Sequence, residues 1–247
     1  IDEINTIPFF AKFYVKERNI LFVHHLCREI WFYEMFFPLS IIGYILEPIY
    51  LWLLRDRKVI TVSESTKKDL MRFGFKAENI QIISEGIEIE PVSEPLSIKK
   101  FDQPTVLSLG TVRAMKRPHH IIKAFDLAKE KFPNLHLIIA GAVEGKYGKK
   151  VLKIIKHSKY KDSIEYLGKV TKEKKIELMQ KSHLLAVTSV KEGWGLVVAE
   201  ASSQGTPALV YNVDGLRDAV KNNQTGLICE RNEPSILAKK IIQVLNN

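Results

Sequence analysis

The second half of the chain constrains the fold most, because short apolar runs alternate there with helical segments. One such helical segment starts with Pro118 in its first turn and carries Ile121, Phe125 and Ala128 at helical spacing. Strands that alternate with helices in this way predict βαβ units and a parallel sheet. The predicted strands are Thr105–Gly110, Leu135–Gly141, Ile164–Gly168, His183–Ser189, Pro207–Tyr211 and Gly226–Cys229.

The ends of these runs point to a binding site. Glycines follow the apolar runs at positions 110, 141, 168 and 193. In open parallel sheets, ligands bind outside the carboxyl ends of the strands. Such a sheet is covered on both faces, so the middle of each strand is expected to be buried. We therefore predict that three residues are buried, namely Leu107, Ile138 and Val187.

The first half has a weaker version of the same pattern. Asn19–His24, Lys58–Val62 and Asn79–Ser84 are predicted strands, and Ser63 caps a helix that closes at Gly74. Prolines, serines and charges fill residues 91–103, a composition typical of a linker. We predict one domain over residues 1–90 and a second over residues 104–247.

Ile30–Leu54 is the most apolar segment of the chain. A membrane-spanning helix needs about 20 apolar residues with few charges, and two glutamates and two prolines interrupt this one. Its tryptophans and tyrosines suit the headgroup level of a bilayer, and Arg55, Arg57 and Lys58 follow it. We expect helices with an apolar edge that lies on a membrane surface; the alternative is that the aromatic side chains fill the domain core.

Composition narrows the class of partner. The 247 residues carry a net charge of +9, which favours phosphate-bearing partners, yet the sequence has no zinc-finger spacing and no RNA-recognition signature. The two cysteines, Cys27 and Cys229, are too few for a disulfide framework and fit a reducing compartment.

The stretch KEGWGLVVAEASSQGTP, residues 191–207, places Glu192 and Glu200 eight residues apart. If both lay on one helix they would be about 12 Å apart. Two such carboxylates can accept hydrogen bonds from hydroxyl pairs at opposite ends of a long ligand, such as a sugar and a ribose. The alternative is a surface turn and a salt bridge. Glu200 lies in an otherwise small and apolar helix, where a carboxylate needs a partner, so we expect a ligand or a base beside it.

The segment GTVRAMKRP follows the first strand of the second half. Arg113, Lys116 and Arg117 come just before a predicted helix N-terminus, which favours anions. This arrangement suits a diphosphate or, alternatively, is a solvated basic turn. No Walker sequence follows Gly110.

The block EGWGLVVAE, followed by GTP and DGL, resembles the donor-site signature of retaining glycosyltransferases of family 4, also called group 1. SESTKKDL, SEGIEIE, SLGTVRAMKRP and IEYLGKV resemble other segments of that family, in order. The resemblance implies the α/β GT-B fold, with two Rossmann-like domains and parallel sheets. The family's glycine-rich first loop should precede residue 1, so we expect the N-terminal domain to be incomplete and the closing C-terminal helix to be cut short.

The resemblance also implies residue roles. Glu192 would hold the hydroxyls of the donor sugar, Glu200 those of the ribose, and Lys116 the phosphates. His24 would lie near the transferred sugar. Backbone groups would contact the nucleotide sugar at Gly110, Lys169, Val170, Gly193, Trp194, Gly195 and Leu196.

Three positions depart from the family pattern, and one of them is Trp194, where the motif commonly has phenylalanine. The arginine that usually follows the loop glycine is Thr111, so Arg113 would take its place. Glu85 stands where the family has asparagine before Gly86.

By this resemblance, the chain is a glycosyltransferase of glycan biosynthesis that uses a UDP-, GDP- or ADP-sugar and retains the anomeric configuration. We expect no metal, since no D-x-D ligand pair is evident, and no nucleic acid partner. The acceptor would be a glycan or a lipid-linked molecule, and the site of action the cytoplasm or the inner face of the membrane. The alternatives are a nucleotide-sugar epimerase of the same fold and a non-catalytic module that binds nucleotide sugars or docks on membranes.

Overall fold

The computed structural model describes residues 1–246 and divides the chain into two compact units. The first unit holds Ile1–Gly86 together with the short segment Val190–Trp194. The second holds Ile87–Ser189 and the chain from Gly195 onward.

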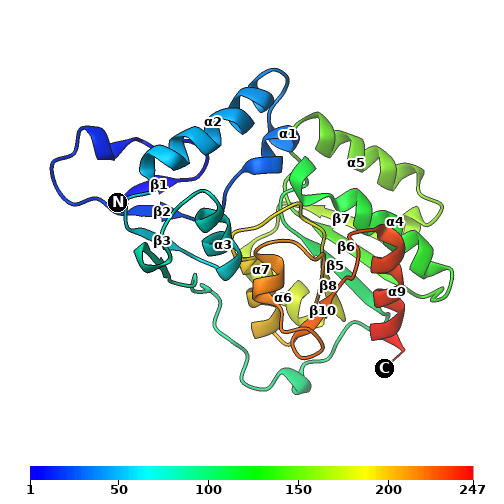
Figure 1. Ribbon diagram of the computed structural model, residues 1–247. Helices are drawn as coiled ribbons and strands as arrows, with labels where there is room; N and C mark the ends of the chain where they lie inside the picture. Colours follow the sequence, from blue (N-terminus) through cyan, green and yellow to red (C-terminus); the bar gives the residue numbers. More distant parts are fainter. Residues whose placement is uncertain (247) are drawn as a thin grey trace. The chain divides into compact units, whose positions relative to one another are not determined.

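The first unit is built on a four-stranded parallel sheet with the strand order β1-β2-β3-β4 (Figure 1). Leu21, Val23, Leu51 and Leu70 are among the residues of its core. Its strands are β1 (Asp2–Ile4), β2 (Leu21–Val23), β3 (Val59–Thr61) and β4 (Ile80–Ile82). Its helices are α1 (Trp31–Glu34), α2 (Leu39–Leu54) and α3 (Glu64–Arg72), with 3-10 turns at Ala11–Phe13, Arg28–Ile30 and Ala77–Asn79.

Local sequence explains helix α3. The Ser63 hydroxyl accepts a hydrogen bond from Thr66 N at 3.2 Å, which satisfies one of the free amides of the first turn. The helix ends at Arg72, two residues before Gly74, whose φ of +88° is strained for other residues. The predicted serine cap and glycine stop are therefore confirmed.

Helix α2 accounts for most of the apolar segment. Its single charged residue, Glu47, is buried, and its carboxylate accepts 2.7 Å hydrogen bonds from the amides of Cys27 and Arg28. Trp31 Nε1 donates a third bond to Glu47 at 3.1 Å. The prediction of helices here is confirmed. Of the described residues, 1–246, none forms a helix with the length and apolar character that crossing a membrane needs.

The second unit is a six-stranded parallel sheet with the order β10-β9-β8-β5-β6-β7. Helices α4 and α9 cover one face and α6 and α7 the other (Figure 1). The strands are β5 (Thr105–Leu109), β6 (His136–Ala140), β7 (Ile164–Gly168), β8 (Leu184–Val187), β9 (Ala208–Val210) and β10 (Gly226–Ile228). The helices are α4 (Pro118–Lys129), α5 (Gly145–His157), α6 (Lys172–Lys181), α7 (Leu196–Ser203), α8 (Leu216–Ala219) and α9 (Pro234–Leu245), with 3-10 turns at Pro95–Ser97, Ala114–Lys116 and Lys161–Ser163.

The sheet confirms the predicted α/β fold. Leu107, Ile138 and Val187 are all buried, as the apolar runs predicted. Residues 91–103 pack against the second unit: Val92 N donates to Ser203 O at 3.0 Å, and Lys100 Nζ donates to Gln180 O at 2.8 Å. The chain thus enters the second unit at Ile87.

Strand order also fixes where a ligand can bind. β5 and β8 are neighbours, yet β5 continues outward to β6 and β8 continues in the opposite direction to β9. This reversal is the topological switch point at which open α/β sheets bind their ligands.

Candidate functional site

A small pocket lies at this switch point of the second unit. One wall is the end of β5 with Gly110 and Thr111, and another is the end of β8 with Thr188 and Ser189. Lys116 and Pro118, where α4 begins, complete it. The site therefore combines a lysine, two strand ends and a helix N-terminus, which is a suitable environment for an anion.

Close backbone packing sets the shape of the loop after β5. A Cβ added to Gly141, at the end of β6, would lie 1.9 Å from the carbonyl oxygen of Gly110. Gly141 also has a φ of +156°. Only glycine fits here, and its absence of a side chain lets the two loops lie against each other.

Arg117 joins the two walls of the pocket. Its guanidinium donates hydrogen bonds to the carbonyl oxygens of Thr188 at 2.7 Å and Ser189 at 2.6 Å. The Thr188 hydroxyl lies 3.0 Å from the carbonyl oxygens of both Lys116 and Arg117. Arg117 itself has a left-handed φ of +49°, which is strained for a residue with a Cβ. The side chain thus offsets the strain of its own backbone and holds Lys116 beside the end of β8.

Two histidines follow in the first turn of α4. His119 Nδ1 lies 2.5 Å from the Tyr147 hydroxyl, and His120 Nδ1 lies 2.9 Å from the Tyr211 hydroxyl. Burial, then the neighbouring His119 and Arg117, lowers the pKa of His120 to about 4. Burial also lowers the pKa of His119. A lowered pKa favours the neutral form of both imidazoles, so Lys116 remains a positively charged residue of the pocket lining.

Glu200 forms a salt bridge, which is the alternative that the sequence left open, and its partner is a lysine that the sequence did not indicate. On α7 it forms an ion pair with Lys175 of α6, and the lysine Nζ lies 2.6 Å from its carboxylate. The expectation that this carboxylate has a ligand or a base beside it is met by the lysine. Nothing local in the sequence signals the pair, because the two residues lie on different helices.

Other predicted residues of the second unit lie around the strand ends. Lys169 is exposed and Val170 half-buried, and both directly follow β7. Arg113 faces Glu144, with 4.0 Å between Nη1 and Oε2. Gly195 precedes α7 with a φ of +81°, and Leu196 is the first residue of that helix.

Glu192, Gly193 and Trp194 lie in the segment that clusters with the first unit. The neighbouring Lys191 is buried and forms an ion pair with Asp69 of α3, which is also buried. A Cβ on Gly193 would lie 2.9 Å from His24 O. The structure therefore brings the Glu192 segment next to His24 within the first unit.

His24 follows β2 and lies between two carboxylates. Its Nδ1 is 2.6 Å from Glu85 Oε1, and its Nε2 is 3.3 Å from Glu3 Oε1. Its ring packs edge-on against Phe22. Glu85, noted in the sequence only as a departure from a family pattern, is thus a direct partner of the imidazole.

The predicted site residues therefore do not all lie together. Gly110 and Lys116 line the pocket at the switch point of the second unit, while Glu192 and His24 belong to the first unit. Glu200 lies on α7 outside the lining. Among residues 1–246, no three His, Cys, Asp or Glu side chains gather as metal ligands would.

Comparison with known proteins identifies the family of the chain. Residues 94–247 match the family of glycosyl transferases group 1. The match covers more than half of the chain, so the chain belongs to this family.

Among related sequences, an uncharacterized glycosyltransferase of Haemophilus influenzae is 25% identical over 199 residues, which are 80% of this chain and 54% of that protein. The chain thus spans about half the length of the curated relatives it matches.

Solved structures show the fold. The chain resembles WaaG, a glycosyltransferase involved in lipopolysaccharide biosynthesis, with a TM-score of 0.74 and 18% identity over 96% of this chain and 71% of WaaG. It also resembles Anabaena HepE in complex with UDP and glucose, with a TM-score of 0.68 and 16% identity over 92% of this chain and 68% of HepE. The fold is therefore the GT-B type of these glycosyltransferases.

Proposed function

We propose that this chain transfers a sugar from a nucleoside-diphosphate sugar to an acceptor hydroxyl with retention of configuration, as glycosyltransferases of family 4 do. The observation that carries the proposal is the position of Lys116 in a pocket at the β5–β8 switch point of a group 1 glycosyl transferase domain. HepE, which has the same fold, was solved with UDP and glucose bound.

The second unit would hold the nucleotide. Lys116, the N-terminus of α4 and Arg113 would stabilise the diphosphate as negative charge develops on it when the bond to the sugar breaks. The carboxylate of Glu200 would accept hydrogen bonds from ribose hydroxyls, and it would then exchange Lys175 for the ligand. Backbone groups of Lys169 and Val170 would frame the base.

The sugar end involves the segment of the first unit. Glu192 would hold sugar hydroxyls, with backbone amides at Gly193 and Trp194 beside it. His24, which packs against Gly193 through its backbone, would lie near the transferred sugar. Glu85 would fix the orientation of the imidazole through its 2.6 Å contact with Nδ1.

Removal of the lysine tests this proposal. Lys116→Ala should weaken UDP binding about tenfold or more, because a charged hydrogen bond to a buried phosphate contributes roughly 1.5–3 kcal/mol. Lys131→Ala is the matched control, since this exposed lysine lies beyond the other end of α4. Calorimetry with UDP that gives equal affinities for the two variants would remove Lys116 from the site.

Turnover separates the candidate activities. With a UDP-, GDP- or ADP-sugar and an acceptor, nuclear magnetic resonance should show a product with the anomeric configuration of the donor. Epimerised sugar released without acceptor would instead identify an epimerase. Nucleotide-sugar binding without any product would identify a binding module.

We further propose that the acceptor is lipid-linked and that the reaction takes place at the cytoplasmic face of a membrane. The apolar face of α2 supports this location: Ile45, Ile49 and Trp52 are each more than half exposed. WaaG, which shares the fold, is involved in lipopolysaccharide biosynthesis.

A further inference from the structure

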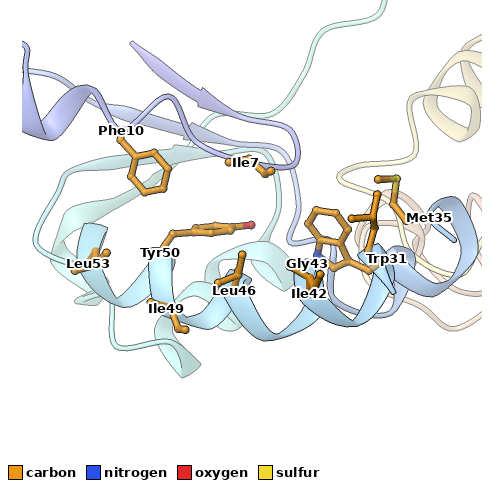
Figure 2. Close-up of a pocket in the computed structure, with 11 residues that line it drawn as sticks. Ile7, Phe10, Trp31, Met35, Ile42, Gly43, Leu46, Ile49, Tyr50 and Leu53 are labelled. Atoms are coloured by element: carbon orange, nitrogen blue, oxygen red, sulfur yellow. The ribbon is translucent and has the colours of Figure 1, made fainter. Parts of the chain in front are cut away.

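An apolar pocket of about 450 Å³ lies in the first unit, between α2 and the loop that carries Ile7 and Phe10. Figure 2 shows Leu46 pointing into it from α2, with Phe10 at one end and Trp31 at the other. The volume falls within the roughly 300–1,000 Å³ of typical small-molecule sites. Among the eleven described residues that line it, none is charged.

The polar groups around the pocket are already bonded elsewhere. The Tyr50 hydroxyl donates to Thr6 O at 2.7 Å, and Trp31 Nε1 donates to the buried Glu47. Because neither has a donor left for a polar ligand, the pocket favours a hydrocarbon occupant. The Trp31 ring also lies against Gly43, where a Cβ would be 2.4 Å away, so the end of the pocket is closely packed.

The surface beside the pocket is apolar as well. Phe36 and Phe37, in the turn before α2, are 71% and 76% exposed. Exposed apolar side chains continue along α2 at Ile41, Ile42, Ile45, Leu46, Ile49 and Trp52. A contiguous apolar surface of this kind marks an interaction site rather than ordinary solvent-facing surface.

Positive charge gathers where α2 ends. The Arg55 guanidinium lies 4.7 Å from the ring of the exposed Trp52, and Arg57 and Lys58 follow. Lys12 Nζ donates to the carbonyl oxygen of Leu53, a pocket residue, at 2.7 Å, and it also contacts Asp56. An apolar slot with a basic end is complementary to a lipid whose headgroup is anionic.

We propose that this pocket binds one hydrocarbon chain of an anionic membrane lipid while the exposed face of α2 lies on the bilayer. The lipid chain enters along Leu46 and the basic residues at the end of α2 meet the headgroup. The assignment of this lipid as the sugar acceptor rests on the proposed function; the binding of the chain does not.

The test fills the pocket without changing the polarity of the surface. Leu46→Trp places a larger ring in the pocket, and Met71→Trp adds the same ring on α3 of the same unit, at an exposed residue outside both the pocket lining and the apolar face of α2. The probe is lysophosphatidylglycerol, an anionic lipid with a single chain, used below its micelle concentration. We expect Leu46→Trp to weaken probe binding about tenfold or more, while Met71→Trp stays near the wild-type affinity.

A second measurement does not depend on the folding of a variant in the pocket. The chain has three tryptophans, and in the double variant Trp52→Phe, Trp194→Phe only Trp31 remains. Lysophosphatidylglycerol with a brominated chain should quench Trp31 fluorescence, and lysophosphatidylcholine should bind more weakly because it lacks net charge.

Three results would overturn the proposal: no binding of the probe by the wild-type chain, equal losses in Leu46→Trp and Met71→Trp, or self-association in sedimentation that accounts for the apolar face without lipid. UDP affinity is measured on the same samples. Lipid binding without UDP binding would contradict the proposed transferase function and support the lipid site. UDP binding without lipid binding would contradict the lipid site and leave the proposed transferase function supported.

Discussion

At the scale of single residues, Glu200 shows how a carboxylate can be stable in a mainly apolar helix before a ligand arrives. Its side chain is 13% exposed and is held by Lys175 at 2.6 Å. Breaking such a pair costs more than an exposed ion pair contributes, so a ligand has to supply replacement hydrogen bonds.

We predict that Glu200→Ala weakens UDP binding by roughly 1–3 kcal/mol, because the ribose hydroxyls lose a charged acceptor. Glu177→Ala is the control: it removes the same charge from α6, where Glu177 pairs with Lys174 and Lys181 on the surface. Isothermal calorimetry measures both affinities. If the two variants bind UDP equally well, Glu200 has no place in the nucleotide site.

At Arg117 the strained backbone conformation lowers stability, whereas the hydrogen bonds of the side chain raise it. Its left-handed backbone costs roughly 1–2 kcal/mol, and its guanidinium binds two carbonyl oxygens at the end of β8. We predict that Arg117→Gly raises the KM for the donor several-fold, because Lys116 is no longer held beside β8. Any gain in stability from relief of the backbone strain is offset by the lost hydrogen bonds.

The control for this variant is Asn223→Gly, at a residue that has a left-handed φ of +64° and whose side chain makes no hydrogen bond found among residues 1–246. It should leave the donor KM unchanged and keep or raise the thermal midpoint. An unchanged donor KM in Arg117→Gly would show that the hydrogen bonds from Arg117 to the end of β8 do not position Lys116.

At the scale of elements, the first turn of α4 makes stability depend on pH. The pKa of His120 is lowered from 6.5 to about 4, first by burial and then by His119, Arg117 and Lys123. The unfolded chain therefore takes up a proton at a higher pH than the folded chain does. The stability that the neutral ring contributes is complete above pH 6.5 and is lost as the pH falls from 6.5 to 4.

We predict that His120→Asn reduces this loss, because an amide can keep a hydrogen bond to Tyr211 without titrating. Urea unfolding between pH 4 and 7 measures the free energy of unfolding at each pH. The wild-type chain should lose more of it on acidification than the variant. Parallel pH curves for the two proteins would assign the acid sensitivity to other groups.

The sequence is most informative about the positions of individual strands and helices. The strands of the second half were predicted within about a residue or two because continuous apolar runs identify buried parallel strands. Contacts between distant elements left no such local pattern. Lys175 and Glu200 lie on separate helices, Arg117 binds the end of β8, and Lys191 pairs with Asp69. In the sequence Arg117 is only a positive charge before a helix, since its backbone conformation is visible only in the fold.

At the scale of the whole molecule, the two carboxylates of the motif belong to different units. Glu192 lies in Val190–Trp194, which clusters with the first unit, whereas Glu200 lies on α7 of the second. The chain passes from one unit to the other at Gly195, whose φ of +81° few other residues adopt. A motif that is continuous in sequence thus supplies one residue to each unit, and the two residues should have separable roles.

We predict that Glu192→Ala leaves the affinity for free UDP unchanged and weakens the binding of the UDP-sugar, because its carboxylate would hold only sugar hydroxyls. Glu200→Ala should weaken both ligands, since both carry the ribose. Glu192→Gln removes the negative charge but keeps a hydrogen-bond acceptor of similar shape. Because an amide oxygen still accepts hydrogen bonds, this variant should recover part of the affinity for the UDP-sugar. Competition calorimetry with UDP and a UDP-sugar gives both affinities for each variant. If Glu192→Ala weakened free UDP as much as Glu200→Ala does, the two carboxylates would serve the same end of the ligand, and the proposed division of roles between the units would fail.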